Sequence, residues 1–482
     1  MESFLEGLER AQYRALAGLT ETPGLSAVYD RHAFLFEPET FRSVAPPGAP
    51  PDPRRAYLRE FLAEGIEGHR TRDLRDDFLA AEATSTISLG GETIRYRRAP
   101  VLIRREADRG RRAALDAARL AVLSGTLNPL LQEMIERCHA VAQELLGVSY
   151  DAYCETLAGV DFDALEREVE TLLDETRDAH ADLLAHYSRR ILSGVRADDL
   201  QNHDLAHLLY GAEFHALFQP ERMIERVTGA VEAMGLDLTA GGRVELDLGE
   251  RPAKAPRAFC APIRVPEEIK LVLQLYGGYD DYTTLLHELG HALHFAHVDP
   301  GQPMEFRRLG DNGVTEGYAM TFDHLMQTPE FLRRVIGIDD PEDFLRFIGF
   351  RDLVLLRRYG AKFLYERSLH RSGPAPGRAA EYVERLSEAT GANTPATLYL
   401  DDVDPHFYVI RYLRAWMLAG ALHVALRERF DADWFLNPGS GPFLQDLWSL
   451  GQALPAEDLA RERLGFERLT FAPLLELIHE RL

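Results

Sequence analysis

The chain has 482 residues, of which 46% are hydrophobic and 27% are charged. This composition is typical of globular proteins and excludes long disordered, collagen-like or silk-like chains. The formal net charge is −23, from 77 acidic and 54 basic residues. A surface of this sign repels phosphate backbones and anionic lipids, so we expect no nucleic acid partner and no membrane partner.

The cysteines and the N-terminal sequence indicate a reducing compartment. Cys138, Cys154 and Cys260 are far apart and form no CxxC pair, which argues against a disulfide framework and against a cysteine metal site. Residues 1–19 have an amphipathic pattern without the apolar core of a secretory signal, and we find no apolar run of about 18 residues that predicts a membrane span. We therefore expect a cytoplasmic protein.

Helical periodicity dominates the chain. After the N-terminal helix, a capping-box pattern at 163–166 predicts the start of a long helix that continues to about Tyr187. Apolar residues at helical spacing predict further helices at about 110–147, 205–235, 340–368, 376–390 and 408–430. A hairpin is expected around Gly90-Gly91, and short strands are expected at 244–248, 258–263 and 270–275.

The motif with the clearest chemistry lies in a helix that follows the last of these strands. The sequence HELGH at 287–291 places two histidines four residues apart, so both imidazoles lie on one helical face about 6 Å apart. Two ligands of a tetrahedral Zn²⁺ need this separation. Glu288 follows the first histidine, His287, and can serve as the general base that holds a metal-activated water.

A zinc site needs a third protein ligand beside His287 and His291, and three residues compete for this role. His297 has the spacing of a third metzincin ligand, but that geometry requires a glycine at the midway position, which is His294 here. Asp311 has a short side chain on a predicted loop. Glu316 lies in the first turns of a predicted second helix, from which its carboxylate completes a His₂Glu site with one open position. We therefore favour Glu316.

Other polar residues have simpler interpretations. His203 and His207 are also four residues apart, but no third ligand is evident, which favours a polar helix face. We expect His294 to be packed in the interior or to contact a ligand residue. Asp323 is expected to be solvated, with the orientation of a ligand imidazole as the alternative.

A second segment concentrates polar ring groups at a loop-to-helix junction. It contains His406, Tyr408 and Tyr412. The N–H or O–H of such side chains can donate to the oxyanion that forms when water attacks a carbonyl. Tyr408 and Tyr412 are expected to share a helical face. A stripe of aromatic side chains packed in the core is the other interpretation.

Together these segments resemble the thimet oligopeptidase and oligoendopeptidase F family of zinc peptidases. The resemblance covers about 200–482. It rests on TTLLHELGHALH, on a glutamate 25 residues after the second histidine, and on three further segments, at 254–260, 406–412 and 450–466. The tripeptide Ile-Arg-Tyr at 410–412 and NGVTEGYAM around Glu316 are also similar to angiotensin-converting enzyme and to thermostable carboxypeptidases.

The resemblance implies a mainly α-helical, two-lobed body around a deep substrate groove, with a small antiparallel β-sheet beside the zinc site. It also implies an N-terminal helical region at 1–200 and a catalytic region at 201–482. The implied roles are zinc binding by His287, His291 and Glu316, general base catalysis by Glu288, and oxyanion stabilisation by His406 and Tyr412, with Tyr408 as an additional or alternative donor.

We therefore predict a zinc-dependent oligopeptidase whose partners are short peptide substrates. A strand near 270–275 could pair with the extended substrate backbone. A carboxypeptidase or dipeptidyl carboxypeptidase is an alternative, and it would need a cationic clamp such as Arg411, Arg414 or Lys362. A non-catalytic peptide-binding protein is a third interpretation. Monomer and homodimer both stay open.

Overall fold

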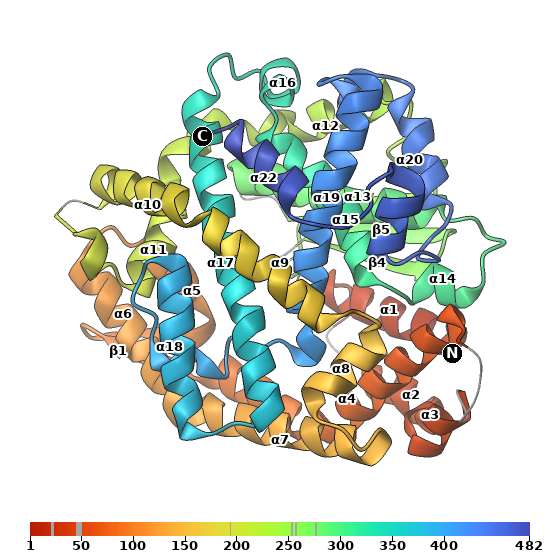
Figure 1. Ribbon diagram of the computed structural model, residues 1–482, viewed down its shortest axis with the longest axis horizontal. Coiled ribbons are helices and arrows are strands. Elements are labelled where there is room, and N and C mark those ends of the chain that lie inside the picture. Colours follow the sequence, from red (N-terminus) through yellow and green to blue (C-terminus); the bar gives the residue numbers. More distant parts are fainter. Residues whose placement is uncertain (21–23, 45–50, 193, 252–253, 256–257, 275–276) are drawn as a thin grey trace. The chain divides into compact units, whose positions relative to one another are not determined.

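The computed structural model describes residues 1–20, 24–44, 51–192, 194–251, 254–255, 258–274 and 277–482. The chain is mainly helical, as predicted, and carries two small sheets (Figure 1). It divides into two compact units, each assembled from separate stretches: unit 1 comprises residues 1–61, 213–349 and 410–482, and unit 2 comprises 62–212 and 350–409. The sequence predicted a single division at residue 200, and the extent of a catalytic region stays a prediction.

Unit 1 contains eleven helices and three strands of the described chain. Its helices are α1 (Glu2–Leu16), α2 (Leu25–Arg31), α3 (Pro38–Val44), α12 (Met223–Ala233), α13 (Tyr279–His297), α14 (Met304–Arg308), α15 (Asn312–Asp323), α16 (Pro329–Phe331), α20 (Ser440–Trp448), α21 (Ala456–Leu459) and α22 (Ala472–His479). Its strands are β3 (Val244–Asp247), β4 (Phe259–Arg264) and β5 (Glu268–Val272). Helix α13 packs against β4, β5 and α15 and buries Leu285, Leu289 and Leu293 completely or nearly so.

Unit 2 is a helical assembly with one hairpin. Its helices are α5 (Ala99–Arg105), α6 (Arg109–Val122), α7 (Asn128–Leu145), α8 (Tyr150–Ala158), α9 (Phe162–Glu175), α10 (Arg177–Ile191), α11 (Asn202–Leu208) and α18 (Pro376–Thr390). Strands β1 (Thr86–Leu89) and β2 (Glu92–Arg95) form the predicted antiparallel hairpin, and Gly90 and Gly91 both have the positive φ that its tight turn requires. Helices α4 (Pro53–Thr84), α17 (Glu342–Ser372) and α19 (Val409–Phe430) run from one unit into the other.

The three-stranded sheet differs from the expected antiparallel one. The strand order is β3-β5-β4, and β4 is antiparallel to β5 whereas β3 is parallel to it. Strand β5 contributes Ile269, Leu271 and Val272, all fully buried, and therefore takes the central position. Strand β3 pairs with the edge of β5 that β4 leaves open. The expected strand at 270–275 ends at Val272, and Leu275 lies outside the described residues.

Several predicted helices are interrupted. The helix expected from 163 to Tyr187 is two helices, α9 and α10, with a break at Thr176, whose hydroxyl donates to the Leu172 carbonyl. Its N-cap is Asp161, not Asp163, because the Asp161 side chain accepts from the backbone N–H of Ala164. The region 110–147 contains a π-helical turn between α6 and α7, and 205–235 contains 3₁₀ turns between α11 and α12.

One segment differs from the expectation that no helix could span a membrane. The helical segment Pro405–Phe430 is long and apolar enough by length and composition, but 72% of its apolar window is buried inside the protein. A buried helix of a protein core has the same composition.

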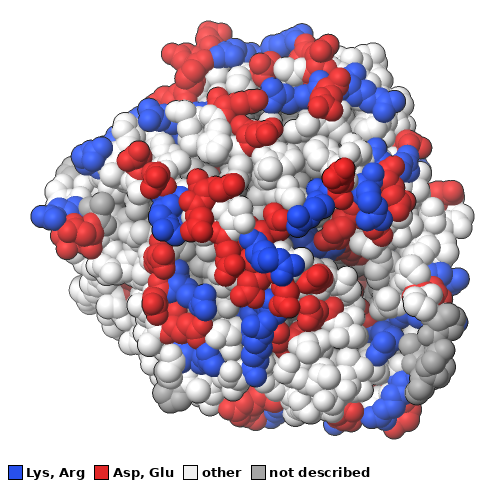
Figure 2. Space-filling model, in the orientation of Figure 1, with Lys and Arg blue, Asp and Glu red and all other residues white. Residues whose placement is uncertain are grey.

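On the face drawn in Figure 2, Lys and Arg side chains lie among Asp and Glu side chains.

Candidate metal centre

The two helices that carry the predicted ligands, α13 and α15, approach each other closely at Gly290. A Cβ atom on Gly290 would lie 2.6 Å from the Cα atom of Ala319 and 2.9 Å from the carbonyl oxygen of Tyr318. No side chain fits at such distances, so the glycine in HELGH is what allows the two backbones to pack together. This close approach places Glu316 opposite the two histidines of α13.

The three predicted ligands form one cluster within unit 1. Glu316 Oε2 lies 3.4 Å from His287 Nε2 and 3.6 Å from His291 Nε2. One ligand atom of each residue lies within 4.8 Å of those of the other two. Ligand atoms about 2.0–2.1 Å from a tetrahedral Zn²⁺ are about 3.3 Å from one another, so the donor types and their spacing fit this ion.

The other ring nitrogen of each histidine has a partner on α15. Asp323 Oδ2 lies 2.8 Å from His287 Nδ1, and Thr315 Oγ1 lies 2.9 Å from His291 Nδ1. These contacts leave both Nε2 atoms directed at Glu316. The expectation that Asp323 is solvated is therefore wrong, because its side chain is 14% exposed and contacts the imidazole. The alternative, orientation of a ligand imidazole, describes its position.

The local electrostatics favour positive charge at the cluster. Burial opposes ionisation of Glu316, but the imidazoles of His287 and His291 beside it lower the pKa of this carboxyl below its usual range. Burial also opposes protonation of His287, yet its hydrogen bond to Asp323 and the nearby Glu316 carboxylate raise the pKa of the imidazole. The carboxyl groups of Glu316 and Asp323 therefore both act on the histidine pair. Either protons on the imidazoles or a metal cation supply the compensating positive charge.

The competing third ligands lie elsewhere. His297 Nδ1 lies 2.8 Å from the carbonyl oxygen of Leu293, and its ring packs 5.5 Å from Trp448. Asp311 is the N-cap of α15, and its carboxylate accepts hydrogen bonds from Arg414 at 2.8 and 2.6 Å. Among the described residues, the structure thus brings Glu316, and neither alternative, to the histidine pair.

The side chain of Glu288 contacts the three-stranded sheet. Its Oε2 atom accepts a hydrogen bond of 2.8 Å from the backbone N–H of Cys260 in β4. His294 is fully buried, its Nδ1 lies 3.2 Å from the hydroxyl of Thr315, and its ring packs 4.9 Å from that of Tyr318. Burial lowers the pKa of His294 to about 3, which keeps it neutral. The prediction of a packed His294 is confirmed.

The second predicted segment is divided between the two units. His406 and Tyr408 belong to unit 2, whereas Tyr412 lies in the first turn of α19 in unit 1. The Tyr412 side chain packs on a cluster that includes Met320, one turn after Glu316 on α15. Helix α19 also lies against α15 at Gly317, where an added Cβ would meet the Leu418 side chain at 2.7 Å. Tyr412 is therefore held next to the helix that carries Glu316.

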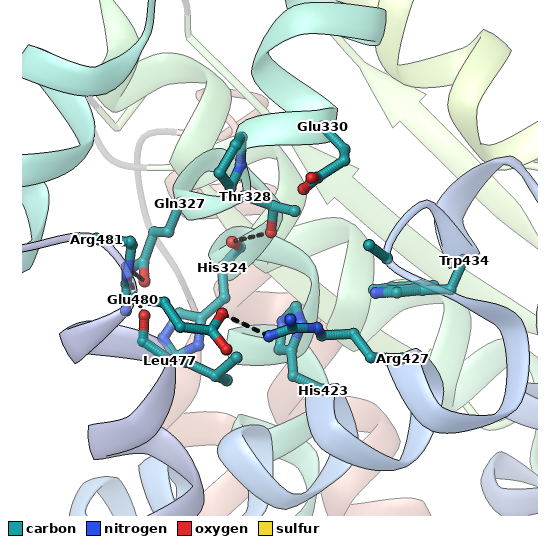
Figure 3. Close-up of a pocket in the computed structure, with 12 residues that line it drawn as sticks. His324, Gln327, Thr328, Glu330, His423, Arg427, Trp434, Leu477, Glu480 and Arg481 are labelled. Carbon is teal, nitrogen blue, oxygen red and sulfur yellow. Dashed lines mark hydrogen bonds and ion pairs between the residues drawn. The ribbon is translucent and has the colours of Figure 1, made fainter.

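Unit 1 contains a pocket of about 130 Å³ (Figure 3). One of the residues that line it is His324, which directly follows Asp323 in the chain. The rings of His324 and His423 stack in it with centroids 5.8 Å apart, and Glu480 pairs with Arg427 at 2.7 Å on its wall. None of the three clustered residues lines this pocket. It is therefore separate from the candidate metal centre.

Sequence reasoning missed the groups that orient the cluster. Thr315 was not singled out, although it directly precedes Glu316, and neither was the backbone N–H of Cys260 that contacts Glu288. The spacing of seven residues between Glu316 and Asp323, two turns of one helix, was the available signal for Asp323. No protein family model matches this chain, and the comparison with curated proteins found no match.

Proposed function

We propose that this protein is a zinc-dependent metallopeptidase that hydrolyses short oligopeptides. The observation that carries the proposal is the convergence of His287 Nε2, His291 Nε2 and Glu316 Oε2, with Glu288 next to them in sequence. A zinc ion in such a site acidifies a coordinated water and polarises the substrate carbonyl.

Glu288 supplies the proton transfers in this proposal. Its carboxylate accepts a proton from the attacking water and then donates it to the leaving amine of the cleaved bond. The contact with Cys260 N–H holds one carboxylate oxygen of Glu288 on the sheet side of α13. The family resemblance adds His406 and Tyr412, with Tyr408 as the alternative donor, as groups that stabilise the oxyanion.

Strand β4 is the proposed guide for the substrate. It lies at an edge of the three-stranded sheet, and its Cys260 N–H contacts Glu288. An extended peptide that adds to this edge would place a backbone carbonyl near Glu288. The strand predicted near 270–275 cannot do this, because β5 is central and is paired on both sides. The two-lobed groove that the resemblance implies belongs to the same proposal.

Replacement of Glu288 tests the proposed chemistry. The Glu288→Gln variant keeps the shape of the side chain and all three ligands but has no basic carboxylate. We expect near-normal zinc content and a loss of about 10²–10⁴-fold or more in kcat on a quenched fluorogenic peptide. The wild-type activity should disappear with a chelator and return with Zn²⁺. A Glu288→Gln variant within about tenfold of wild type would contradict the assignment.

The contacts of the candidate clamps favour an oligopeptidase over an exopeptidase. Arg411 pairs with Glu60 at 3.1 Å, and Arg414 is held by Asp311. Lys362 pairs with Asp404 at 2.9 Å. Because each of these three cations already pairs with a carboxylate of the protein, none of them is positioned solely to bind the C-terminal carboxylate of a substrate. Mass spectrometry of a peptide digest should therefore show internal cleavage rather than successive removal of C-terminal residues. A non-catalytic peptide-binding protein would leave the peptides intact.

A further inference from the structure

A carboxylate in the interior of unit 2 contacts one of the predicted oxyanion donors. Glu67 of α4 is 1% exposed, and its Oε2 atom accepts a hydrogen bond of 2.9 Å from the hydroxyl of Tyr150. Its Oε1 atom is buried, has no hydrogen-bond partner among the described residues, and lies 3.5 Å from Nδ1 of His406. His406 is thus the basic group that contacts this carboxylate.

The surroundings of Glu67 make this basic partner important. Burial raises the pKa of Glu67 above its ordinary value, and the proximity of His406 opposes this rise without cancelling it. Tyr150, Tyr153 and Cys138 also face the carboxylate, and burial raises the pKa of each, so they stay neutral. A buried carboxylate that lacks a cationic partner is strongly destabilising. The imidazole of His406 can supply that positive charge.

The backbone at His406 is held in an uncommon conformation. His406 has φ 53° and ψ 29°, and Phe407 has φ 51°, both in the left-handed region that non-glycine residues seldom adopt. Phe407 is fully buried, and its ring packs 5.0 Å from the rings of Phe162 and His370. Strain of this kind persists only where the surrounding structure fixes it, and it is concentrated at functional sites.

The two observations have a common consequence for the His406 ring. The anchored backbone fixes the position from which the His406 side chain extends. The contact with Glu67 fixes which ring nitrogen is directed inward. A carboxylate at 3.5 Å favours a proton on Nδ1, because an unprotonated Nδ1 would place two lone pairs against each other. The side chain of His406 is 19% exposed, so its ring is not fully enclosed by the protein.

We propose that Glu67 is the positioning residue of His406: its carboxylate accepts from Nδ1–H and directs Nε2 away from the interior, so that Nε2–H is the donor to substrate when the ring carries both protons. This inference rests on the proposed function, in which His406 stabilises the oxyanion. The pairing of a carboxylate with one imidazole nitrogen to orient the other is the same device that Asp323 provides for His287.

A double-mutant cycle tests whether Glu67 acts through His406. Glu67→Gln keeps the shape but removes the charge, and it should lower kcat about 10- to 100-fold with KM within about twofold. In a His406→Ala background, Glu67→Gln should change kcat by less than about twofold. Tyr150→Phe, which removes the donor to the other carboxylate oxygen, is the matched control and should stay within about threefold of wild type. Losses that multiply in the double variant would overturn the proposal.

A spectroscopic measurement is independent of peptidase activity. In ¹⁵N-histidine-labelled full-length protein, the spectrum of His406→Ala identifies the His406 signals. We expect a protonated Nδ1 for His406 in the wild type and loss of this hydrogen-bonded proton in Glu67→Gln. An unprotonated Nδ1 in the wild type would overturn the pairing, even if the protein cleaves peptides. If the pairing is seen but no peptide is cleaved, the proposed function fails instead.

Discussion

The ring nitrogens of His287 and His291 have different tasks. Each Nδ1 is held by a side chain of α15, Asp323 in one case and Thr315 in the other, so each Nε2 is left for the cluster with Glu316. A carboxylate partner also raises the basicity of an imidazole, and loss of such a partner typically lowers metal affinity or activity about 10- to 100-fold. The orientation of the cluster is therefore built into α15.

Tyr412 is the residue for which the catalytic and the packing interpretations differ most. Tyr412→Phe removes only the hydroxyl, and the ring can still pack on the cluster of Met320, Ala415 and Ala419. If the hydroxyl donates to the oxyanion, kcat should fall about 10²–10³-fold with KM nearly constant and thermal stability unchanged. Steady-state kinetics on a fluorogenic peptide measures this.

Tyr408→Phe is the matched control, one helical turn earlier in the chain. It should retain activity if Tyr412 is the donor. A crippled Tyr408→Phe with a normal Tyr412→Phe would assign the role to Tyr408. Full activity of both variants would make His406 the leading donor and would leave Tyr412 as a packing residue.

At the scale of elements, the contact between α13 and α15 sets the distance between the histidines and Glu316. Gly290 lies at the point of closest approach, where Ala319 and the Tyr318 carbonyl leave no room for a Cβ atom. The spacing in HELGH is thus the result of two requirements: histidines on one face of α13, and a glycine on the face against α15.

Gly290→Ala should separate the two helices and weaken the cluster. We expect metal affinity to fall about tenfold or more and the free energy of unfolding to fall by about 1–3 kcal/mol, as for other overpacked sites. Gly229→Ala in α12 is the control, because that position is exposed and an added Cβ meets no atom within 4 Å. It should raise the free energy of unfolding by about 0.5–1 kcal/mol. Unchanged zinc affinity in Gly290→Ala would contradict this role of the glycine.

Sequence patterns predicted the elements better than their junctions. Helical periodicity placed α17, α18 and α19 within a few residues of their ends, and the Gly90-Gly91 turn identified the hairpin. The break at Thr176 was missed because the apolar spacing continues through it, whereas the Thr176 backbone departs from the regular helical conformation, with φ −98° and ψ −1°. The parallel pairing of β3 with β5 was missed because it depends on how the strands pack in the folded structure.

At the scale of the whole molecule, buried neutral histidines couple stability to pH. Burial lowers the pKa of His180 to about 3 and that of His423 to about 4, from an ordinary value of 6.5. The unfolded chain therefore binds more protons than the folded protein below pH 6.5. The stabilisation is fully present above that pH and is lost as the pH falls toward 4.

Urea denaturation between about pH 7 and pH 5 should show this loss. Each of these histidines contributes a slope of up to about 1.4 kcal/mol per pH unit. Replacing one, as in His180→Asn, should reduce the slope by a similar amount. A free energy of unfolding that does not change over this range would contradict neutral burial of both rings.

Contacts between segments that are far apart in the chain were not predicted from the sequence. The histidine pair and Glu288 follow from local spacing in one helix, and Glu316 was favoured among three candidates for the third ligand. The contact of His406 with Glu67 joins segments more than 300 residues apart, and no periodicity relates them. The assembly of each unit from separate stretches is likewise a property of packing that no local sequence pattern predicts.

The zinc content of the purified protein and of two variants tests the proposed metal site. Elemental analysis should find about one zinc per chain in the wild type. Glu316→Gln should lose most of it, because a neutral amide is a far poorer ligand than a carboxylate, and His297→Ala should keep it. Loss of zinc from His297→Ala together with full zinc in Glu316→Gln would contradict the site described for this protein.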